Sequence, residues 1–380
     1  MTDTTRYWLW LSLALGVNTP KYRRIFDAYD SVVDFYSDSE YGWRLAGFLS
    51  EKDIDTLNKI KLADADELII KCKNLNIDIV CFDDENYPKP LMDIYAPPCI
   101  LYVWGTLPDF ENRLSIAMIG TRNATQYGVM TSHVLSSSLA KLGVIIVSGG
   151  ALGIDTASHI GALEADGTTV CVLGCGIDYR YLMSNALLRK NIASTGAVIS
   201  EYPPGTSAFK GNFPIRNRII SGLSHGVVVV EADEKSGSLI TANHALEQGR
   251  EVFAVMGNIN SLYSSGTNKM IKDGAAPVTS YKDILEAFPR FEIKTEKELE
   301  QEYSHRNSME NNKAPSKHRE DVELSDTVRK VYECIGNEPI HADKIAALSG
   351  LHISKVLQAL TELELLALVS CQRGRLYKLV

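Results

Sequence analysis

Six short apolar runs in the middle of the chain lack the polar alternation of a strand with one solvated face. They are LSIAMIG, GVIIVSGG, GTTVCVLGCG, GAVISEYP, HGVVVVEA and REVFAVMG, and a helix-like segment follows each of them. This alternation predicts a parallel sheet that helices cover on both faces. We therefore expect an α/β fold with a doubly wound, Rossmann-like sheet that ends near residue 291.

The chain before this sheet follows a different period. Residues 1–75 carry apolar positions at helical spacing, broken at GVNTP and LSEKD, which predicts a small helical domain of the SAM or helix-hairpin-helix kind. Two strands around a Pro-rich loop follow within residues 77–105, and they could join the sheet as its edge. We therefore place an extended Rossmann-like domain at residues 76–291.

The last ninety residues fall into two parts. Residues 292–322 are highly charged and nearly free of large apolar side chains, so we expect a charged flexible linker there. Residues 323–380 contain three short helical patterns and then two strands that turn at Arg373 and Gly374. Three helices and a hairpin predict a winged-helix domain.

No stretch of the sequence has the length or the flanks of a membrane or export segment. The opening RYWLWLSLALGV lacks a following small-residue cleavage site, so a buried helix is the better interpretation. No run approaches the roughly 20 apolar residues that a membrane span needs. We expect no membrane partner.

Composition then restricts the chemistry. The 380 residues carry a formal net charge of −8, which argues against an indiscriminate polyanion binder, so any anion site must be local. The cysteines are scattered and form no CxxC pair: Cys72, Cys81, Cys99, Cys171, Cys175, Cys334 and Cys371. This pattern favours a reducing cytoplasm, with no metal and no cofactor.

The loops after the predicted strands gather glycine and hydroxyl residues. In open parallel sheets, ligands bind beyond the carboxyl ends of the strands. The loop SGGALGID contains Ser148, Gly149 and Gly150, and the loop EADEKSGSLIT contains Ser236, Gly237 and Ser238 just before a helix. Both loops could offer backbone amides to an anion, although each pattern taken singly also fits ordinary turn chemistry.

Cationic side chains stand beside the same loops, and they favour an anion site. Arg122 follows the first strand of the sheet, Lys210 precedes the segment FPIRNR, and Arg216, Asn217 and Arg218 lie within it. Arginine binds phosphate oxygens bidentately and stacks on bases.

Each of these side chains also has a structural interpretation. Arg218 could instead pair with a core carboxylate, either Glu201 or Glu231. Phe209 and Phe213 could stack on bases, but an aromatic residue beside a strand is usually core, and we favour that interpretation for Phe213.

The sequence shows no arrangement typical of catalysis. No Ser-His-Asp or Cys-His set is evident, and no acidic residue stands clearly at the end of the second strand of the sheet to bind a ribose. His159 lies at core spacing on a helix, and Asp155 near the start of that helix is better explained by the helix dipole than as a base. We expect a protein that is not an enzyme.

Taken together, the loop motifs resemble the DprA/Smf family (DNA-processing protein A). The matching segments are GTRNATQYG, SGGALGIDTASHIGAL, SEYPPGTSAFKGNFPIRNRIISGLS, VVEADEKSGSLITANHALEQGREVFAVMGN and GTNKMIKDGA, and they cover about 115–280. The resemblance implies a cytoplasmic bacterial protein that binds and protects incoming single-stranded DNA. It also implies loading of RecA recombinase onto that DNA in natural transformation, a homodimer, and no known catalysis.

The resemblance assigns DNA contacts to Arg122, Lys210 and the RNR of residues 216–218. The chain departs from the family pattern at three places. Leu152 replaces the usual Arg of SGxARGID, Tyr181 and Leu182 replace the YP after GxD, and Met256 replaces the usual Pro before Gly257. The first departure removes one expected phosphate contact.

Two other functions stay open at this point. One is a nucleotide-processing enzyme of the lysine-decarboxylase-like phosphoribohydrolase group, although the PGGxGTxxE signature of that group is absent. The other is a duplex-binding regulator that acts through the winged helix. Because the expected recognition helix, HISKVLQALTELELL, combines Lys355 and Gln358 with Glu362 and Glu364, we expect this domain to serve chiefly protein contacts or regulation.

Overall fold

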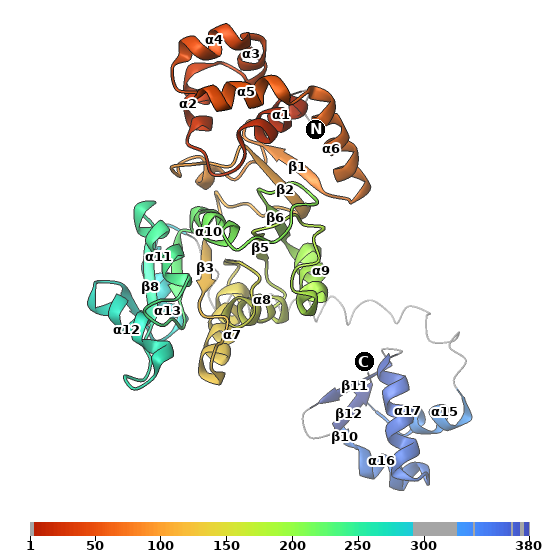
Figure 1. Cartoon of the computed structure of the whole chain (residues 1–380). Coiled ribbons are helices and arrows are strands. Elements are labelled where there is room, and N and C mark those ends of the chain that lie inside the picture. The colour runs from red at the N-terminus through yellow and green to blue at the C-terminus, as the bar shows by residue number, and fades with distance from the viewer. Residues whose placement is uncertain (1–3, 292–324, 337–338, 366–367, 373–375, 380) are drawn as a thin grey trace. The chain divides into compact units, whose positions relative to one another are not determined.

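The computed structural model describes residues 4–291, 325–336, 339–365, 368–372 and 376–379. It divides the chain into two compact units, residues 1–301 and 302–380 (Figure 1). The charged segment 292–322, expected to be a linker, lies outside the described residues.

Six helices open the first unit and pack around an aromatic core. Trp8, Trp10, Phe35 and Trp43 are almost fully buried in it, and Phe35 stacks on Trp43 with ring centroids 5.6 Å apart. The helices are α1 (Thr5–Leu15), α2 (Lys21–Ala28), α3 (Val32–Ser37), α4 (Ser39–Ala46), α5 (Glu51–Lys59) and α6 (Leu62–Asn74). The same core includes strand residues such as Tyr102, so the helices cover one face of the first two strands.

A nine-stranded sheet follows, in the order β1-β2-β6-β5-β4-β3-β7-β8-β9. The strands are β1 (Asp78–Cys81), β2 (Ile100–Gly105), β3 (Ser115–Ile119), β4 (Ile145–Ser148), β5 (Thr169–Leu173), β6 (Ala197–Ser200), β7 (Gly226–Val229), β8 (Glu251–Val255) and β9 (Ala276–Val278). Strands β3 to β9 pair in parallel, whereas β1 and β2 pair antiparallel at one edge. The doubly wound sheet and its added edge are confirmed. Strand β9 was not predicted.

Successive residues of each strand face two separate cores, because strand side chains alternate. Ile119 and Val147 pack beneath Ile219 of α10, and Met118 and Ile146 pack against Leu135 of α7. Helices α7 (Gln126–Lys141), α8 (Ile154–Glu164), α9 (Ala186–Thr195) and α13 (Tyr281–Glu286) accompany the sheet with α10 (Asn212–Gly222), α11 (Ser238–Glu247) and α12 (Ser265–Lys272). Short 3-10 turns lie at Lys89–Leu91, Met183–Asn185 and Leu262–Ser264.

The strand order reverses at β3. From β3 the chain winds outward through β4, β5 and β6, then returns along α10 to β7 on the other side of β3. In open α/β sheets, this reversal leaves a crevice at the carboxyl ends of the two strands, where ligands bind. The fold thus places the ends of β3 and β7 at the expected ligand site.

In its described residues, the second unit contains three helices and a small antiparallel sheet ordered β10-β12-β11. Its elements are α15 (Asp326–Glu333), β10 (Ile340–His341), α16 (Ala342–Ser349), α17 (Ile353–Leu365), β11 (Val369–Gln372) and β12 (Leu376–Leu379). Val331, Ile345, Val356 and Leu360 form its core. The winged-helix prediction is confirmed, although Arg373 and Gly374 of the expected turn lie outside the described residues.

Two further features of the described residues bear on function. No helix among them is long and apolar enough to cross a membrane. Five cysteines of the first unit are buried free thiols: Cys72, Cys81, Cys99, Cys171 and Cys175.

Candidate nucleic-acid interface

A pocket of about 500 Å³ lies at the crevice between β3 and β7. Four segments line it: the loop after β3, the β4–α8 loop, the first turns of α10 and the loop before α11. The lining residues are Ile119, Gly120, Thr121, Arg122, Ala151, Asp155, Lys210, Phe213, Pro214, Arg216, Asn217, Ile220, Asp233, Ser236, Gly237, Ser238, Ile240 and Thr241. The topology therefore brings together loops that are more than 100 residues apart in the sequence.

Helix α10 gives the pocket an aromatic ring and a cation on the same face. Pro214 is tolerated because it lies in the first turn, where no backbone N–H is needed for the helix. Phe213 and Arg216 are three residues apart, so their side chains are neighbours. The Cζ atom of Arg216 lies 5.8 Å from the centre of the Phe213 ring.

Arg122 reaches the same ring from the loop after β3. Its Cζ atom lies 5.3 Å from the centre of the Phe213 ring, and the Arg122 side chain is exposed. Tyr181 also contacts this ring, with centroids 5.2 Å apart and planes tilted by 40°. Phe213 is only half-buried and lines the pocket, so our expectation that it is an ordinary core residue is wrong.

Arg216 is held at the floor of the pocket with 4% of its surface exposed. Its Nη1 donates to the carbonyl of Gly149 at 2.8 Å and to the carbonyl of Val172, and its Nε donates to Asn217 Oδ1 at 3.2 Å. Among the described residues, no acceptor is found for a hydrogen bond from its Nη2. The guanidinium of Arg216 is therefore anchored through Nη1 and Nε, and its Nη2 can donate a hydrogen bond to a ligand.

A buried carboxylate accompanies this cation. Burial raises the pKa of Asp155, while Arg216 and the backbone N–H of Ala151 counteract that rise. Burial lowers the pKa of Arg216, and Asp155 opposes that change. A Cβ on Gly149 would lie 2.8 Å from both Arg216 Nη2 and Asp155 Oδ2, so a larger residue there would force these two groups to shift.

Lys210 adds a flexible positive charge at the rim. It is exposed and follows Phe209, whose surface is 67% exposed, in the loop before α10. With Arg122 and Arg216 it gives three cations, against the two carboxylates of Asp155 and Asp233. This local positive surplus is the kind of site that an acidic protein needs to bind an anion.

The loop before α11 contributes hydroxyl groups more than free amides. Ser236 Oγ lies 2.8 Å from Ser238 Oγ, and the N–H groups of Ser238 and Leu239 already donate to Ser236. A Cβ on Gly237 would meet open space, so the backbone there is accessible from the pocket. The positive end of the ten-residue helix α11 also lies here, and it favours a negative ligand.

Four predicted site residues have places other than the pocket surface. Ser148 is fully buried and donates to the carbonyl of Met118 at 2.6 Å. Gly149 and Gly150 form the turn behind Arg216, and Gly150 adopts a φ of +67°. Arg218 lies in the core.

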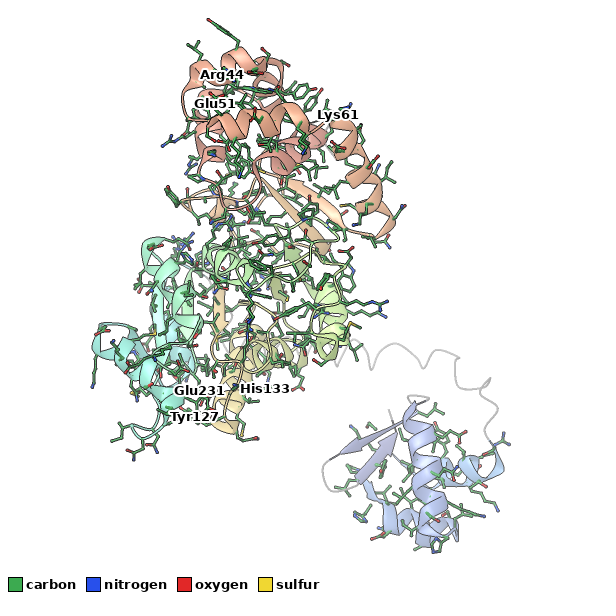
Figure 2. The ribbon with its side chains drawn as sticks, in the orientation of Figure 1. Arg44, Glu51, Lys61, Tyr127, His133 and Glu231 are labelled. Carbon is green, nitrogen blue, oxygen red and sulfur yellow. The ribbon has the colours of Figure 1, made fainter. Side chains whose placement is uncertain are left out.

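Arg218 pairs with Glu201, one of the two partners that the sequence left open. Its Nη2 donates to both carboxylate oxygens of Glu201, at 2.7 and 2.9 Å, and only 6% of its side chain is exposed. Glu231 instead accepts hydrogen bonds from the backbone and hydroxyl of Thr125 at the start of α7, near Tyr127 (Figure 2). The structure therefore places Arg218 behind the pocket.

Sequence reasoning missed four lining residues with polar side chains, namely Thr121, Asp233, Thr241 and Asp155, the last of which it assigned to the helix dipole. Asp233 and Thr241 flank the predicted Ser236–Ser238 segment, and Thr121 precedes Arg122. The sequence feature that could have identified them is their position beside predicted site residues, at the end of a strand or the start of a helix.

Comparisons with known proteins agree with this fold and site. A family model described as DNA recombination-mediator protein A matches residues 78–289. A second, the DprA winged helix domain, matches residues 315–375. Together they span the sheet and most of the second unit.

Individual relatives are similar over much of their length. The DNA processing protein DprA of Bacillus subtilis (strain 168) is 43% identical over 213 residues, which cover 56% of this chain and 72% of the relative. The protein Smf of Escherichia coli (strain K12) is 36% identical over 300 residues, covering 79% and 76%.

Two solved structures share the fold. The DNA processing protein A of Streptococcus pneumoniae superimposes with a TM-score of 0.64 at 32% identity, covering 78% of this chain and all of that one. The Helicobacter pylori protein gives a TM-score of 0.51 at 32% identity, covering 56% and 96%. That second structure was solved in a study of the protein's unique single-stranded DNA binding mode.

Proposed function

Because this chain belongs to the DprA/Smf family of DNA-processing proteins, we propose that its strand-end pocket binds single-stranded DNA. The observation that carries the proposal is the approach of two guanidinium groups, the exposed Arg122 and the anchored Arg216, to the ring of Phe213. An aromatic ring beside guanidinium groups accepts any base by stacking, while the cations bind phosphates. The Helicobacter pylori relative, whose study concerned its single-stranded DNA binding mode, supports the same ligand.

The proposed contacts fall into two kinds. Arg122, Arg216 Nη2 and Lys210 bind phosphate oxygens, with Asn217, Ser236, Gly237 and Ser238 completing the wall of the pocket. The ring of Phe213 stacks on a base. Because neither kind of contact reads a base edge, binding is largely independent of sequence.

Replacement of a single rim cation tests this proposal. Lys210→Ala should weaken binding of a labelled oligothymidylate about threefold or more, as expected for one lost phosphate contact. Lys141→Ala is the matched control, because Lys141 ends α7 just before β4, at the amino ends of the strands and thus opposite the pocket. Equal binding by the two variants would refute a DNA site at this pocket.

We also propose that the site binds its ligand without transforming it. The carboxylate of Asp155 is buried and engaged by the Ala151 N–H at 3.3 Å, so it is poorly placed to move a proton to or from a substrate. Incubation with nucleoside monophosphates should therefore release no free base. Released base would favour the phosphoribohydrolase alternative.

The wider role follows from the family. We propose that the protein acts in the cytoplasm as a homodimer, protects incoming single strands and loads RecA recombinase onto them during transformation. A mixture of RecA, single strands and a single-strand-binding protein should form RecA filaments faster when this protein is added. An unchanged rate of filament formation would refute RecA loading, but it would not contradict DNA binding by the pocket.

The winged-helix unit, residues 323–380, is proposed to serve chiefly protein contacts. Helix α17 exposes Lys355 and Gln358 but also Glu362, and a carboxylate is unfavourable against DNA phosphates. Removal of this unit should leave most single-strand affinity in place.

A further inference from the structure

A lysine of the N-terminal helices holds the loop that leads to the pocket. Lys71 lies on α6, and its Nζ donates to the carbonyl of Pro204 at 2.7 Å. The same Nζ lies 3.8 Å from Asp178 Oδ2. Lys71 is not among the residues that line the pocket at the ends of β3 and β7.

The residues after Pro204 are fixed by the same group of side chains. Gly205 donates its N–H to Asp178 Oδ1 at 2.6 Å, and the carbonyl of Thr206 accepts from the N–H of Gly176 at 2.9 Å. Gly205 adopts a φ of +94°, and a Cβ there would lie 2.7 Å from Lys71 Nζ. Three consecutive loop residues are therefore held against α6 and the β5–α9 connection.

The N-terminal helices also contact this loop at its root. Glu201, the first residue after β6, pairs with Arg218 and accepts the backbone N–H of Asn18 at 3.3 Å. Leu13 of α1 and Leu68 of α6 line a shallow pocket together with Pro203 and Pro204. The N-terminal helices thus support both the root and the middle of the loop.

The far end of the same loop carries DNA-binding groups. Lys210 follows Pro204 by only six residues, and α10 begins immediately afterwards with Phe213 in its first turn. Among the described residues, no side chain forms a hydrogen bond with Ser207, Ala208 or Lys210. Apart from the packing of Ala208 against the core and the start of α10 at Asn212, the position of Lys210 depends on the anchored residues 204–206.

We propose that Lys71 is a positioning residue for single-stranded DNA binding, which links the N-terminal helices to the pocket through the loop of residues 201–211. This proposal rests on the proposed function of the pocket. A loop that is ordered before the ligand arrives avoids the entropy cost of ordering it during binding. Loss of the Lys71 anchor should therefore weaken binding without removing any phosphate contact.

Salt dependence separates this role from a direct contact. A lysine that touches a phosphate contributes about 0.7 to the slope of log affinity against log salt for single strands. A positioning lysine changes the affinity and leaves that slope unchanged. Replacement of Lys71 should lower the affinity whether the lysine touches a phosphate or only positions the loop, so affinity alone cannot distinguish these two roles.

The experiment uses three variants of the full chain and a labelled oligothymidylate. Lys71→Met removes the ammonium, Lys71→Arg keeps a donor for the Pro204 carbonyl, and Lys73→Met removes the same charge from an exposed neighbour on α6. We expect Lys71→Met to bind about fivefold more weakly with the wild-type slope. Lys71→Arg should recover most of the affinity, and Lys73→Met should bind like the wild type.

Amide hydrogen exchange supplies a readout independent of DNA. The N–H groups of Gly205 and Thr206 should exchange faster in Lys71→Met than in Lys73→Met, since only the former loses the anchor. Three results for Lys71→Met would each overturn the proposal: unchanged amide exchange at Gly205 and Thr206, wild-type affinity for single strands, or a salt slope that is shallower by about 0.7. If Lys210→Ala also binds like the wild type, the proposed function of the pocket has failed as well.

Discussion

The guanidinium of Arg122 lies over the ring of Phe213, with its Cζ atom 5.3 Å from the ring centre. Arg122 comes from the loop after β3 and Phe213 from the first turn of α10, ninety-one positions later, and they meet because β3 and the helix that leads to β7 flank the same crevice. The pair offers one charge for a phosphate and one flat surface for a base. Replacement of each residue should therefore give a different signature.

Phe213→Leu should reduce single-strand affinity while preserving its salt dependence. Loss of base stacking on an aromatic side chain costs about 1–3 kcal/mol, which is roughly five- to 150-fold in the dissociation constant. Titrations at several salt concentrations measure both quantities. Tyr41→Leu is a suitable control, because Tyr41 lies on α4 with 79% of its surface exposed and does not line the pocket. A wild-type affinity in Phe213→Leu would mean that no base stacks there.

Arg218→Met should lower the free energy of unfolding, while the folded variant should keep most of its affinity for single-stranded DNA. It leaves the carboxylate of Glu201 buried without its ion-pair partner, which typically costs about 3–5 kcal/mol. The midpoint of urea unfolding reports this loss. The double variant Arg218→Met with Glu201→Gln should recover part of it, because the uncompensated charge is gone. A fully stable Arg218→Met protein that no longer binds DNA would contradict a core role.

These two arginines show what the sequence could and could not predict. Arg216 and Arg218 were predicted together as DNA contacts from their position beside a strand end, and of the two only Arg216 lines the pocket. However, residues two apart on a helix point in different directions. The sequence offered a core ion pair as an alternative for Arg218, but it could not decide between that pair and a DNA contact, because the partner Glu201 comes from a distant segment.

The sheet itself was predictable because its strands are buried on both faces and therefore consist of continuous apolar runs. Strand β9, Ala276–Val278, escaped because it has only three residues and includes a proline. Phe213 was assigned to the core because aromatic residues beside strands are usually buried. Its place at the pocket, in contact with Arg122 and Tyr181, results from segments that are distant in the sequence. Such long-range contacts leave no pattern in the local sequence.

His159 should make stability fall with decreasing pH. Its Nδ1 lies 2.7 Å from Thr169 Oγ1, which itself donates to the carbonyl of Ile146, so Nδ1 carries the proton and the buried Nε2 is bare. Burial lowers the pKa of His159 to about 3. In the unfolded chain the pKa of a histidine is ordinary, near 6.5. Between about pH 6.5 and pH 3, the unfolded chain is therefore protonated at His159 whereas the folded chain is not.

The free energy of unfolding should consequently decrease by up to about 1.4 kcal/mol per pH unit below pH 6 on account of this residue. His159→Asn keeps a donor for Thr169 but does not titrate, so its thermal midpoint should depend less steeply on pH between 6 and 5. His225 remains in both proteins, and burial lowers the pKa of its imidazole to about 4, so it contributes equally to each. Identical pH slopes for the two proteins would refute the assignment.

Leu152→Arg should strengthen single-strand binding. Leu152 is 44% exposed beside Ala151, which lines the pocket, and it stands where the family pattern has arginine. A guanidinium there should add one phosphate contact and steepen the salt slope by about 0.7. Leu45→Arg adds the same charge to an exposed site on α4 and should change neither quantity. A similar gain in both variants would indicate a general charge effect.

The salt dependence of single-strand binding by the double variant Arg122→Ala and Lys210→Ala tests the central claim most directly. Both side chains are exposed at the pocket rim, so their removal should leave the fold intact. If each binds one phosphate, the slope of log affinity against log salt should become shallower by about 1.4 relative to the wild type, with a large loss of affinity at low salt. A wild-type slope in the double variant would contradict the claim that this pocket holds the DNA backbone.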